Sequence, residues 1–544
     1  MNHPKNTEMG TKVGHEFSWL SRYAPEFCVK GENIEILETP TDFYQRLKSE
    51  AKNAQKRVVL AALYLGNGGL EEDLVGSVID AAKKTDNNVK VDILLDYVRG
   101  SRGENNSKTM LKPLIDQYNG SDKLTISLYH TPKLRGLLKK YLPARWNEVI
   151  GVAHLKVFIF DDTFIISGAN LSNDYFVNRQ DRYMVFHDCG QLADYFHQLV
   201  NTVGMFSFQL VSVTNQKLIY NGDHHPFEGD ENAFKKAAQE SVMALIKRHL
   251  AQNALTNVKL FQEGIISKTK LGFNNFFQYS TSLLTSISNA ALSLLGFGKS
   301  IIEKNYDSSQ ISTHEMTQNF ISQTTSDKQN TNCKFDTWVY PTIQMGLFGI
   351  RQDEVVTETL MKTFPKGSTV SFTTGYFNVT DKYCYEVVNN AANYNILLSS
   401  PEANGFFGSK GFSGYIPAVY IHLCKKFSKK VAAYNRKEDI SLWEYIRDGW
   451  TFHGKGMFCY LPGEKLPSMS LIGSPNFGLR SVSRDLEAQV VVVTKNPKLQ
   501  QRLHDEQNYL MKHTRKITSE TFQQPRYNVP RWVAFVTFFI KRYF

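Results

Sequence analysis

One set of four residue types occurs twice in this chain of 544 residues, in the same order each time. A histidine and a lysine stand two positions apart, an asparagine follows, and a carboxylate comes eleven positions after the asparagine. The repeat predicts a fold built from two equivalent halves. The two sets are His154, Lys156, Asn170 and Asp181, and His453, Lys455, Asn476 and Glu487.

The spacing differs in one interval only. His154 and Asn170 are 16 positions apart, whereas His453 and Asn476 are 23 positions apart. The seven additional positions are explained by a turn-like stretch, 462–468, which contains two prolines and a glycine. The second set is therefore the first set with a longer turn.

Apolar runs around both sets predict strands that alternate with helices. A helix is expected over residues 42–55, with Thr41 and Asp42 as its cap. This alternation is typical of an α/β sheet in each half. The predicted strands are 57–65, 90–97, 124–129 and 157–167, and then 369–377, 395–400, 457–461, 470–473 and 488–494.

The residue types in each set suit chemistry at a phosphorus atom. Side chains two positions apart on a strand project from the same face, so the histidine and the lysine would point together. Lysine and asparagine can hold phosphate oxygens, while a carboxylate can orient the imidazole. Two such halves would place two histidines across one phosphorus, one to attack it and the other to move protons. This chemistry requires no metal and no cofactor.

These sets resemble the His-x-Lys-x-x-x-x-Asp motifs of the phospholipase D superfamily. The first set fits through Asp161, whereas the second has Tyr460 at the matching position. The carboxylate at this position is therefore not required in both halves, and Asp161 is either structural or orienting.

Further motifs narrow the resemblance to the eukaryotic phosphatidylglycerophosphate synthases, which are CDP-diacylglycerol–glycerol-3-phosphate 3-phosphatidyltransferases. The likeness covers roughly residues 30–200 and 335–544. The segments that carry it are 99–103, 167–172, 178–183, 343–346, 374–378, 404–408, 449–453, 473–478 and 484–489.

The resemblance implies two phospholipase D-like α/β domains in a pseudo-twofold arrangement, with the active site between them. The expected parts are an N-terminal segment (1–34), domain 1 (35–204), a variable insertion (205–334), domain 2 (335–512) and a membrane-interface tail (513–544).

The resemblance also implies a reaction: transfer of the phosphatidyl group from CDP-diacylglycerol to glycerol 3-phosphate, on the way to phosphatidylglycerol and cardiolipin. His154 would form a phosphohistidine and His453 would be the base, although the sequence alone does not fix which histidine attacks. The lysines and asparagines of the two sets would hold the phosphoryl oxygens, and Asp181 and Glu487 would orient the histidines. Asp161 counts among the catalytic candidates.

A transferase must also bind the phosphate of its acceptor. Cations in loops near strand ends are candidates for this contact. The alternative for each of them is a solvent-exposed charge that has no role in substrate binding. The candidate substrate-binding residues are Arg99, Arg102, Lys410, Ser474, Arg480 and Arg484.

Three other functions use the same residues. A phospholipase D-type hydrolase or nuclease would use water as its acceptor, and a CDP-diacylglycerol–serine phosphatidyltransferase would use serine. A catalytically inactive lipid-binding protein is the third alternative, although two complete sets argue against it.

The charge balance fits anionic partners. Lys and Arg total 63 against 52 Asp and Glu, a net charge of +11, which suits nucleic acid, an anionic membrane surface or phosphorylated substrates and does not choose among them. No nucleic-acid partner is expected. The six cysteines include no Cys-x-x-Cys pair, so neither a zinc cluster nor a disulfide framework is predicted.

Location is predicted from the resemblance and the chain ends: mitochondrial, peripheral on the inner membrane. The N-terminus has no apolar signal-peptide region and is a poor presequence, which leaves open that a leader has been removed. Residues 271–298 are uncharged with apolar residues near helical spacing, equally suited to a core helix and a membrane-surface helix, and 305–332 are typical of a linker. The aromatic run 531–544 favours an interfacial anchor over a packed terminal helix.

Overall fold

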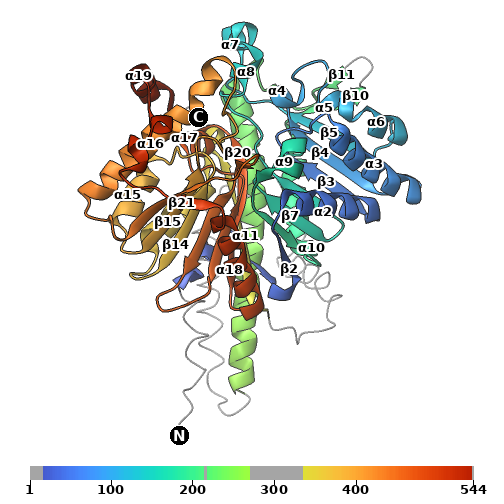
Figure 1. The fold of residues 1–544 in the computed structure, drawn as a ribbon. Coiled ribbons are helices and arrows are strands. Elements are labelled where there is room, and N and C mark those ends of the chain that lie inside the picture. The colour runs from blue at the N-terminus through green and yellow to red at the C-terminus, as the bar shows by residue number, and fades with distance from the viewer. Residues whose placement is uncertain (1–15, 213–216, 270–334, 542–544) are drawn as a thin grey trace. The chain divides into compact units, whose positions relative to one another are not determined.

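The computed structural model describes residues 16–212, 217–269 and 335–541. Two large mixed sheets with helices against them make up this part of the chain (Figure 1). The predicted α/β class is confirmed. Residues up to Leu245 and from Asp336 onward form one compact unit that contains both sheets, and 246–335 form a second.

The first sheet has the strand order β11-β10-β5-β4-β3-β6-β7-β9-β2. Its centre pairs in parallel, β3 with β4 and β4 with β5, and the remaining neighbours are antiparallel. The strands are β2 (Ile34–Leu37), β3 (Arg57–Ala61), β4 (Lys90–Asp96), β5 (Leu124–Tyr129), β6 (Val157–Phe160), β7 (Thr163–Ser167), β9 (Tyr183–Phe186), β10 (Phe208–Ser212) and β11 (Lys217–Ile219).

The second sheet has the order β1-β12-β20-β19-β18-β14-β15-β16-β21, with β13 paired to β12. Its strands are β1 (Phe27–Val29), β12 (Thr337–Met345), β13 (Ile350–Arg351), β14 (Thr369–Thr374), β15 (Asn393–Ser399), β16 (Ile440–Tyr445), β18 (Lys455–Tyr460), β19 (Met469–Gly473), β20 (Leu486–Thr494) and β21 (Thr514–Lys516).

The two sheets have the same topology. Read from one edge, β2-β9-β7-β6-β3-β4-β5-β10 corresponds to β12-β20-β19-β18-β14-β15-β16-β21, and each neighbouring pair has the same direction in both sheets. The turn between β18 and β19 spans 461–468, whereas only two residues separate β6 from β7. These six additional turn residues, with one further residue at the end of β18, account for the longer interval in the second set.

The sheets extend beyond the domain boundaries that the sequence suggested. β1, from the N-terminal segment, pairs with β12 of the second sheet. β10 and β11, from the region assigned to the insertion, complete the first sheet. β21, from the region assigned to the tail, pairs with β16.

Helices bury apolar faces against each sheet and form two separate cores, one in each half. Helix α2 begins at Pro40 rather than Asp42, and its N-cap is Thr39, whose hydroxyl accepts from the Asp42 backbone N–H while the Asp42 carboxylate accepts from the Thr39 N–H. The main covering helices are α2 (Pro40–Asn53), α3 (Gly69–Lys84), α10 (Gly190–Met205), α14 (Gln352–Thr363), α15 (Asp381–Asn389), α16 (Ile416–Ala433) and α18 (Pro497–Met511).

The two halves are tied by backbone as well as side chains. Strands β8 (Arg179–Gln180) and β17 (Thr451–Phe452) pair in parallel across the boundary, and Ala153 pairs with Leu486 in an isolated bridge. Arg182 crosses from the first half and forms an ion pair with Glu506 of α18. The Arg182 side chain is fully buried, so this contact belongs to the core of the interface.

Among the described residues, no helix is long and apolar enough to cross a membrane. Helix α11 spans Glu231–Thr269, while the segments 271–298 and 305–332 lie outside the described residues. The C-terminal run forms α19 (Arg531–Ile540). Val533 and Thr537 are buried, whereas Phe535 and Phe538 are exposed, so α19 packs on the protein and also presents aromatic rings outward.

Candidate active site

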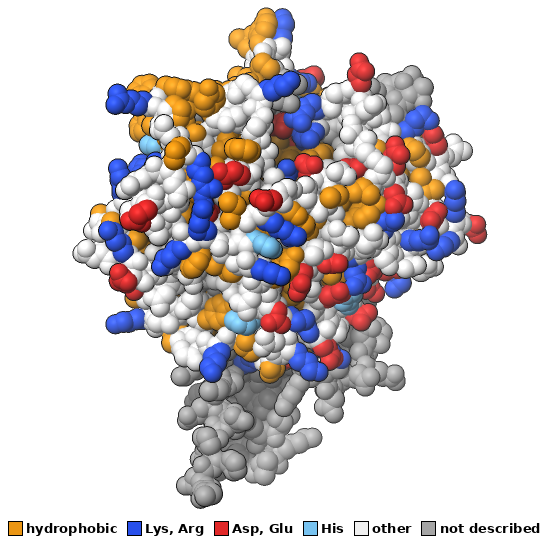
Figure 2. All heavy atoms as spheres, viewed as in Figure 1, with side chains coloured by type: hydrophobic (Ala, Val, Ile, Leu, Met, Phe, Trp, Pro, Cys, Tyr) orange, Lys and Arg blue, Asp and Glu red, His pale blue; other side chains and the backbone are white. Residues whose placement is uncertain are grey.

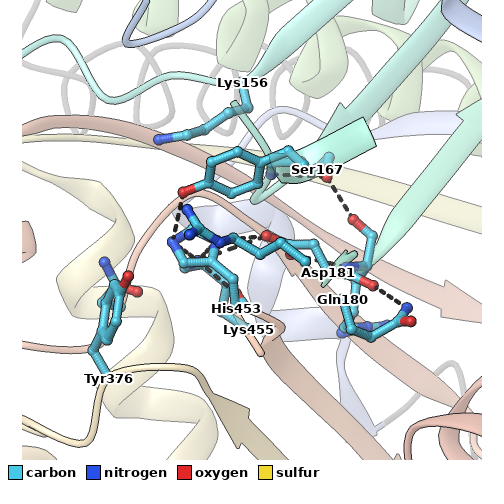
Figure 3. Close-up of polar contacts among 12 residues, drawn as sticks. Lys156, Ser167, Gln180, Asp181, Tyr376, His453 and Lys455 are labelled. Carbon is cyan, nitrogen blue, oxygen red and sulfur yellow. Dashed lines mark hydrogen bonds and ion pairs between the residues drawn. The ribbon is translucent and has the colours of Figure 1, made fainter. Parts of the chain in front are cut away.

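Each predicted histidine is held by the carboxylate of the opposite half. His154 Nδ1 lies 2.8 Å from Glu487 Oε2, and His453 Nδ1 lies 2.6 Å from Asp181 Oδ2. The sequence predicted these four residues as a group, and the structure shows that the pairing is crossed. Because Nδ1 is engaged in both rings, Nε2 is left for chemistry. Figure 3 shows His453 with its carboxylate and lysine partners.

The backbone repeats the same crossed symmetry. The His154 N–H donates to Leu486 O, and the His453 N–H donates to Gln180 O, both at 2.8 Å. In each case the acceptor directly precedes the carboxylate that holds the ring. The same bonds that join the halves therefore set the position of each imidazole.

The two lysines lie beside the histidines with equivalent geometry. Lys156 Nζ donates to His154 O at 2.8 Å, and Lys455 Nζ donates to His453 O at 2.7 Å. Lys455 Nζ also lies 2.8 Å from His453 Nδ1 and 3.9 Å from Asp181. Both ammonium groups are buried, and that of Lys455 lies near the His453 ring nitrogens, where a phosphoryl group would bring negative charge.

Close packing at the site requires glycine at two positions. A Cβ on Gly168 would lie 2.6 Å from Asp181 Oδ1, and a Cβ on Gly375 would lie 2.8 Å from His453 Cα. Neither glycine can accept a side chain unless one member of the His453–Asp181 pair moves.

The two asparagines have matching unsatisfied groups. Among the described residues, Asn170 Oδ1 and Asn476 Oδ1 are buried without a hydrogen-bond partner. Buried polar atoms are normally paired, and these two are acceptors, so they suit a ligand that brings a hydrogen-bond donor, such as a substrate hydroxyl. An amide at this position can donate to a phosphoryl oxygen through its NH₂ group.

Burial controls the protonation of the site. It lowers the pKa of His154 and of His453 well below the usual value, and the neighbouring lysines lower both pKa values further. Burial also raises the pKa of Glu487, and it raises the pKa of Asp181 to about 6. Both effects on the histidines favour the neutral imidazole, which is the form that can attack phosphorus.

Asp161 does not join the site, and its place among the catalytic candidates is corrected. It lies at the far end of β6 from Lys156, with φ 51°, and its carboxylate accepts from the backbone N–H groups of Gln55, Lys56 and Arg57 at 2.9, 2.7 and 3.0 Å. It caps the start of β3. The equivalent Tyr460 lies at the end of β18 and contacts His504 Nδ1 at 3.1 Å.

We expect Asp161→Ala to affect stability rather than turnover. Three backbone N–H groups lose their acceptor and alanine disfavours the left-handed backbone, so the free energy of unfolding should fall by about 1–3 kcal/mol. Urea unfolding measures this loss, and initial rates on the folded variant should stay within about twofold. A large loss of rate in a stably folded variant would return Asp161 to the catalytic group.

The predicted substrate-binding residues fall into two groups. Arg480 donates to Asp485 and to Glu148 O, and its charge lowers the pKa of His154. Ser474 exchanges hydrogen bonds with Ala488, and it stabilises the charged form of Glu487. These two residues support the site from within.

The remaining four candidates lie further out. Arg99 stacks 3.6 Å above the Tyr64 ring, and Arg102 is paired with Glu148. Arg484 donates to the carbonyls of Val149 and Ile150, and Lys410 is exposed on a loop.

The sequence reasoning missed an aromatic and cationic wall around His453. Tyr175 Oη lies 3.5 Å from His453 Nε2, and the Tyr376 ring meets the His453 ring edge-on at 5.3 Å between centroids (Figure 3). Arg179 stacks on Tyr175 at 4.6 Å and donates to Thr451 and Asp174. Tyr376 and Arg179 stand inside segments that carry the family resemblance, which was the available signal for them.

A metal fits this site poorly. Ligand atoms of His154, Asp485 and Glu487 lie within 4.8 Å of one another. However, the two Asp485 oxygens accept from the Val152 N–H and from Arg480, and Glu487 already holds His154. A cation there would have to displace the Arg480 guanidinium.

Comparisons with known proteins agree with this geometry. Residues 47–202 match the family model "Cardiolipin synthase, PLD-like domain". The crystal structure of a phosphatidylserine synthase from Haemophilus influenzae aligns with a TM-score of 0.63 over 98% of this chain and all of that one. At 17% identity this likeness shows the fold alone. The family model and the fold are those of a phospholipase D-like protein, and the two matching sheets indicate two such domains.

Sequence relatives are more specific. The chain is 42% identical to the mitochondrial CDP-diacylglycerol–glycerol-3-phosphate 3-phosphatidyltransferase of Homo sapiens, over 97% of this chain and 86% of the human protein. It is 36% identical to a protein of Dictyostelium discoideum named as a probable CDP-diacylglycerol–glycerol-3-phosphate 3-phosphatidyltransferase, over 98% of this chain and 81% of that one. The chain belongs to the family of CDP-diacylglycerol–glycerol-3-phosphate 3-phosphatidyltransferases.

Proposed function

We propose that the protein transfers the phosphatidyl group of CDP-diacylglycerol to the sn-1 hydroxyl of glycerol 3-phosphate, forming phosphatidylglycerophosphate and CMP. Family membership supports the reaction, and one observation supports its chemistry: two buried histidines, each oriented through Nδ1 by the carboxylate of the other half. The two roles required by a double displacement, nucleophile and proton carrier, then fall to equivalent groups.

In the first step, His154 Nε2 attacks the phosphorus that carries diacylglycerol. The P–O bond to CMP breaks, CMP leaves with the bonding electrons, and a proton on His453 passes to it. The anionic substrate raises the proton affinity of His453 relative to the empty site. Lys156, Lys455 and the two asparagines hold the phosphoryl oxygens while charge develops on them.

In the second step, His453 accepts the proton of the glycerol hydroxyl. The hydroxyl oxygen attacks phosphorus, the P–N bond to His154 breaks, and its electrons return to the ring. Both histidines are then back in their starting states, so the cycle balances without an added reactant.

The hydrogen bonds favour His154 as the nucleophile. Within the described chain, His154 Nε2 has no hydrogen-bond partner, whereas His453 Nε2 contacts Tyr175 Oη at 3.5 Å and Lys455 Nζ at 3.2 Å. The His154 side chain is also the more accessible, 11% exposed against 3%. Approach to a large lipid substrate is therefore easier for His154.

The deciding experiment is CMP release from CDP-diacylglycerol in detergent micelles, with glycerol 3-phosphate, with serine and with neither. Release that requires glycerol 3-phosphate supports the transferase. Release without an acceptor would indicate a hydrolase, and release only with serine would indicate the serine transferase. Binding of CDP-diacylglycerol with no release at all would indicate a lipid-binding protein.

The pH profile of kcat/KM should have a rising limb at low pH and a falling limb at high pH. Asp181 has its pKa raised to about 6, so below that pH it becomes neutral and no longer supports a protonated His453. Burial lowers the pKa of Lys455 to about 8, so above that pH its positive charge is lost from the site. We expect kcat/KM to rise near pH 6 and fall near pH 8. A flat profile between about pH 5 and 9 would contradict these roles.

Location and partners follow the same proposal. Several relatives are named mitochondrial, and the lipid substrate requires contact with a bilayer. We place the protein in mitochondria, peripheral on the inner membrane, at an anionic surface. Fractionation of mitochondria with alkaline carbonate, which releases peripheral proteins, tests this placement.

A further inference from the structure

Exposed apolar side chains gather where three segments meet at one end of the unit that contains both sheets. The segments are 136–147, which holds helices α7 (Gly136–Tyr141) and α8 (Ala144–Asn147); the loop 403–415; and 531–541, which holds α19. Figure 1 shows α7, α8 and α19 at this end, and Figure 2 shows hydrophobic side chains gathered over it. We call these three segments the apical face.

The side chains on this face are large and unusually open to solvent. Leu137 is 75% exposed and Tyr141 68%, while in α19 Phe535 is 70% exposed and Phe538 75%. Phe407 from the loop is also exposed. Apolar groups of this size cost free energy in water, so a contiguous group of them indicates a surface that is covered in use.

Ring contacts join the three segments into one surface across both halves. Trp146 of the first half lies 5.9 Å from Phe412, Phe412 lies 6.2 Å from Trp532, and Tyr415 lies 4.7 Å from Trp532, measured between ring centroids. The face is therefore held by packed aromatic residues, and its outer side chains stand on a fixed base.

The charges identify the occupant. The three segments together contain six Lys and Arg residues and not one Asp or Glu, and one of the six, Lys541, is paired with Asp381 outside them. Lys140 and Arg531 are exposed among the apolar side chains. Aromatic and aliphatic groups flanked by cations suit the interface of a bilayer that carries anionic headgroups, where the rings enter the acyl boundary and the cations meet phosphate.

The same segments continue directly into the active site. Eight positions after Trp146 the chain reaches His154, and between them Glu148 O accepts from Arg480. On the other side, the ring of Phe406 lies 5.7 Å from Tyr376, which contacts His453. A lipid held at the apical face would therefore lie two ring contacts from His453, on a surface whose Trp146 is eight positions from His154 along the chain.

We propose that the apical face docks the protein on an anionic bilayer, so that a lipid substrate reaches the two histidines without leaving the membrane. This inference rests on the proposed function for its lipid substrate. It extends that proposal by assigning the membrane contact to both halves, whereas the sequence favoured the C-terminal tail and left 271–298 open between a membrane-surface helix and a core helix. A protein partner, including a second copy of the chain, is the alternative occupant.

The test measures vesicle binding without turnover. The triple variant Leu137→Ser/Phe535→Ser/Phe538→Ser is compared with Met205→Ser/Val211→Ser, which removes exposed apolar side chains from outside the apical face. We expect flotation with phosphatidylcholine–phosphatidylglycerol vesicles to fall at least about tenfold for the triple variant and to change less than about twofold for the control. Lys140→Gln/Arg531→Gln should weaken binding to these vesicles more than to phosphatidylcholine vesicles.

Two further measurements separate the alternatives. The triple variant should keep its rate of CMP release in detergent micelles, and the single variants Leu137→Ser and Phe538→Ser are measured beside it in case the triple variant folds poorly. Vesicle binding that is unchanged in the triple variant overturns the proposal. If the triple variant binds vesicles normally but sediments with a lower mass than the wild-type protein, the face serves self-association instead. The two proposals can fail separately. If the wild-type protein shows no transferase activity but binds vesicles, and the variants lose that binding, the docking face is supported and the proposed function is refuted.

Discussion

His154→Ala should lower the rate of CMP release by at least about 10³-fold, because the nucleophile that forms the intermediate is removed. The substitution leaves Glu487 in place. Of the contacts between the two halves, it removes only those made by the imidazole ring. Initial rates in micelles with saturating glycerol 3-phosphate measure the effect. The matched control is His504→Ala, which removes a partly buried imidazole that contacts Tyr460 outside the site.

Trapping the intermediate assigns the two histidines. CDP-diacylglycerol labelled in its diacylglycerol part should leave label on the wild-type protein after rapid quenching, with acid avoided because phosphohistidine is acid-labile. His154→Ala should carry no label, whereas His453→Ala should retain it because the step that releases the intermediate is slowed. Label on His453 in a protein whose His154 is intact would reverse the assignment.

Arg182→Met should lower the free energy of unfolding by about 3–5 kcal/mol. Arg182 is fully buried, donates to Glu506 at 2.7 and 3.0 Å and to Leu471 O and Ser470 Oγ at 2.8 Å, and its guanidinium lies 4.0 Å from the Phe458 ring. Methionine fills much of the volume but leaves the Glu506 carboxylate buried without its partner. Urea unfolding followed by circular dichroism measures the loss.

Two further variants show whether the charge is responsible. Arg182→Met/Glu506→Gln removes both charges, so it should recover part of the stability that the single variant loses. Lys112→Met breaks an exposed ion pair with Asp116 and should cost no more than about 0.5 kcal/mol. If Arg182→Met costs as little as Lys112→Met, the buried pair does not hold the halves together.

The sequence predicted the local parts of this molecule well because their signals are local. Apolar runs such as 124–129 match strand β5 residue for residue, and the repeated spacing of the two sets is enough to reveal the duplication. The spacing also predicted Asp181 and Glu487 as partners of the histidines. Which carboxylate serves which histidine depends on contacts across more than 270 positions, and spacing within one half carries no information about them.

The errors have a similar origin. Asp161 was grouped with the catalytic residues because it belongs to a linear motif, but a strand places residues five positions apart about 16 Å from each other. Tyr175 and Arg179 were not assigned roles because aromatic and cationic residues are common, and only the fold brings them to His453. The cap of α2 was misplaced by two positions, which is within the usual uncertainty of helix ends.

The crossed pairing, in which each histidine is bonded to the carboxylate of the opposite half, also indicates how the chain evolved. A symmetric dimer of a single ancestral half would have two identical pairs, each made of a histidine from one subunit and an acid from its partner. Fusion into one polypeptide frees the copies to diverge while each still depends on the other. The differences now present, Asp181 opposite Glu487 and Asp161 opposite Tyr460, are the differences that such a history permits. Mutations in the two halves are consequently expected to show strong epistasis, because a change to either acid alters the orientation of the histidine in the other half.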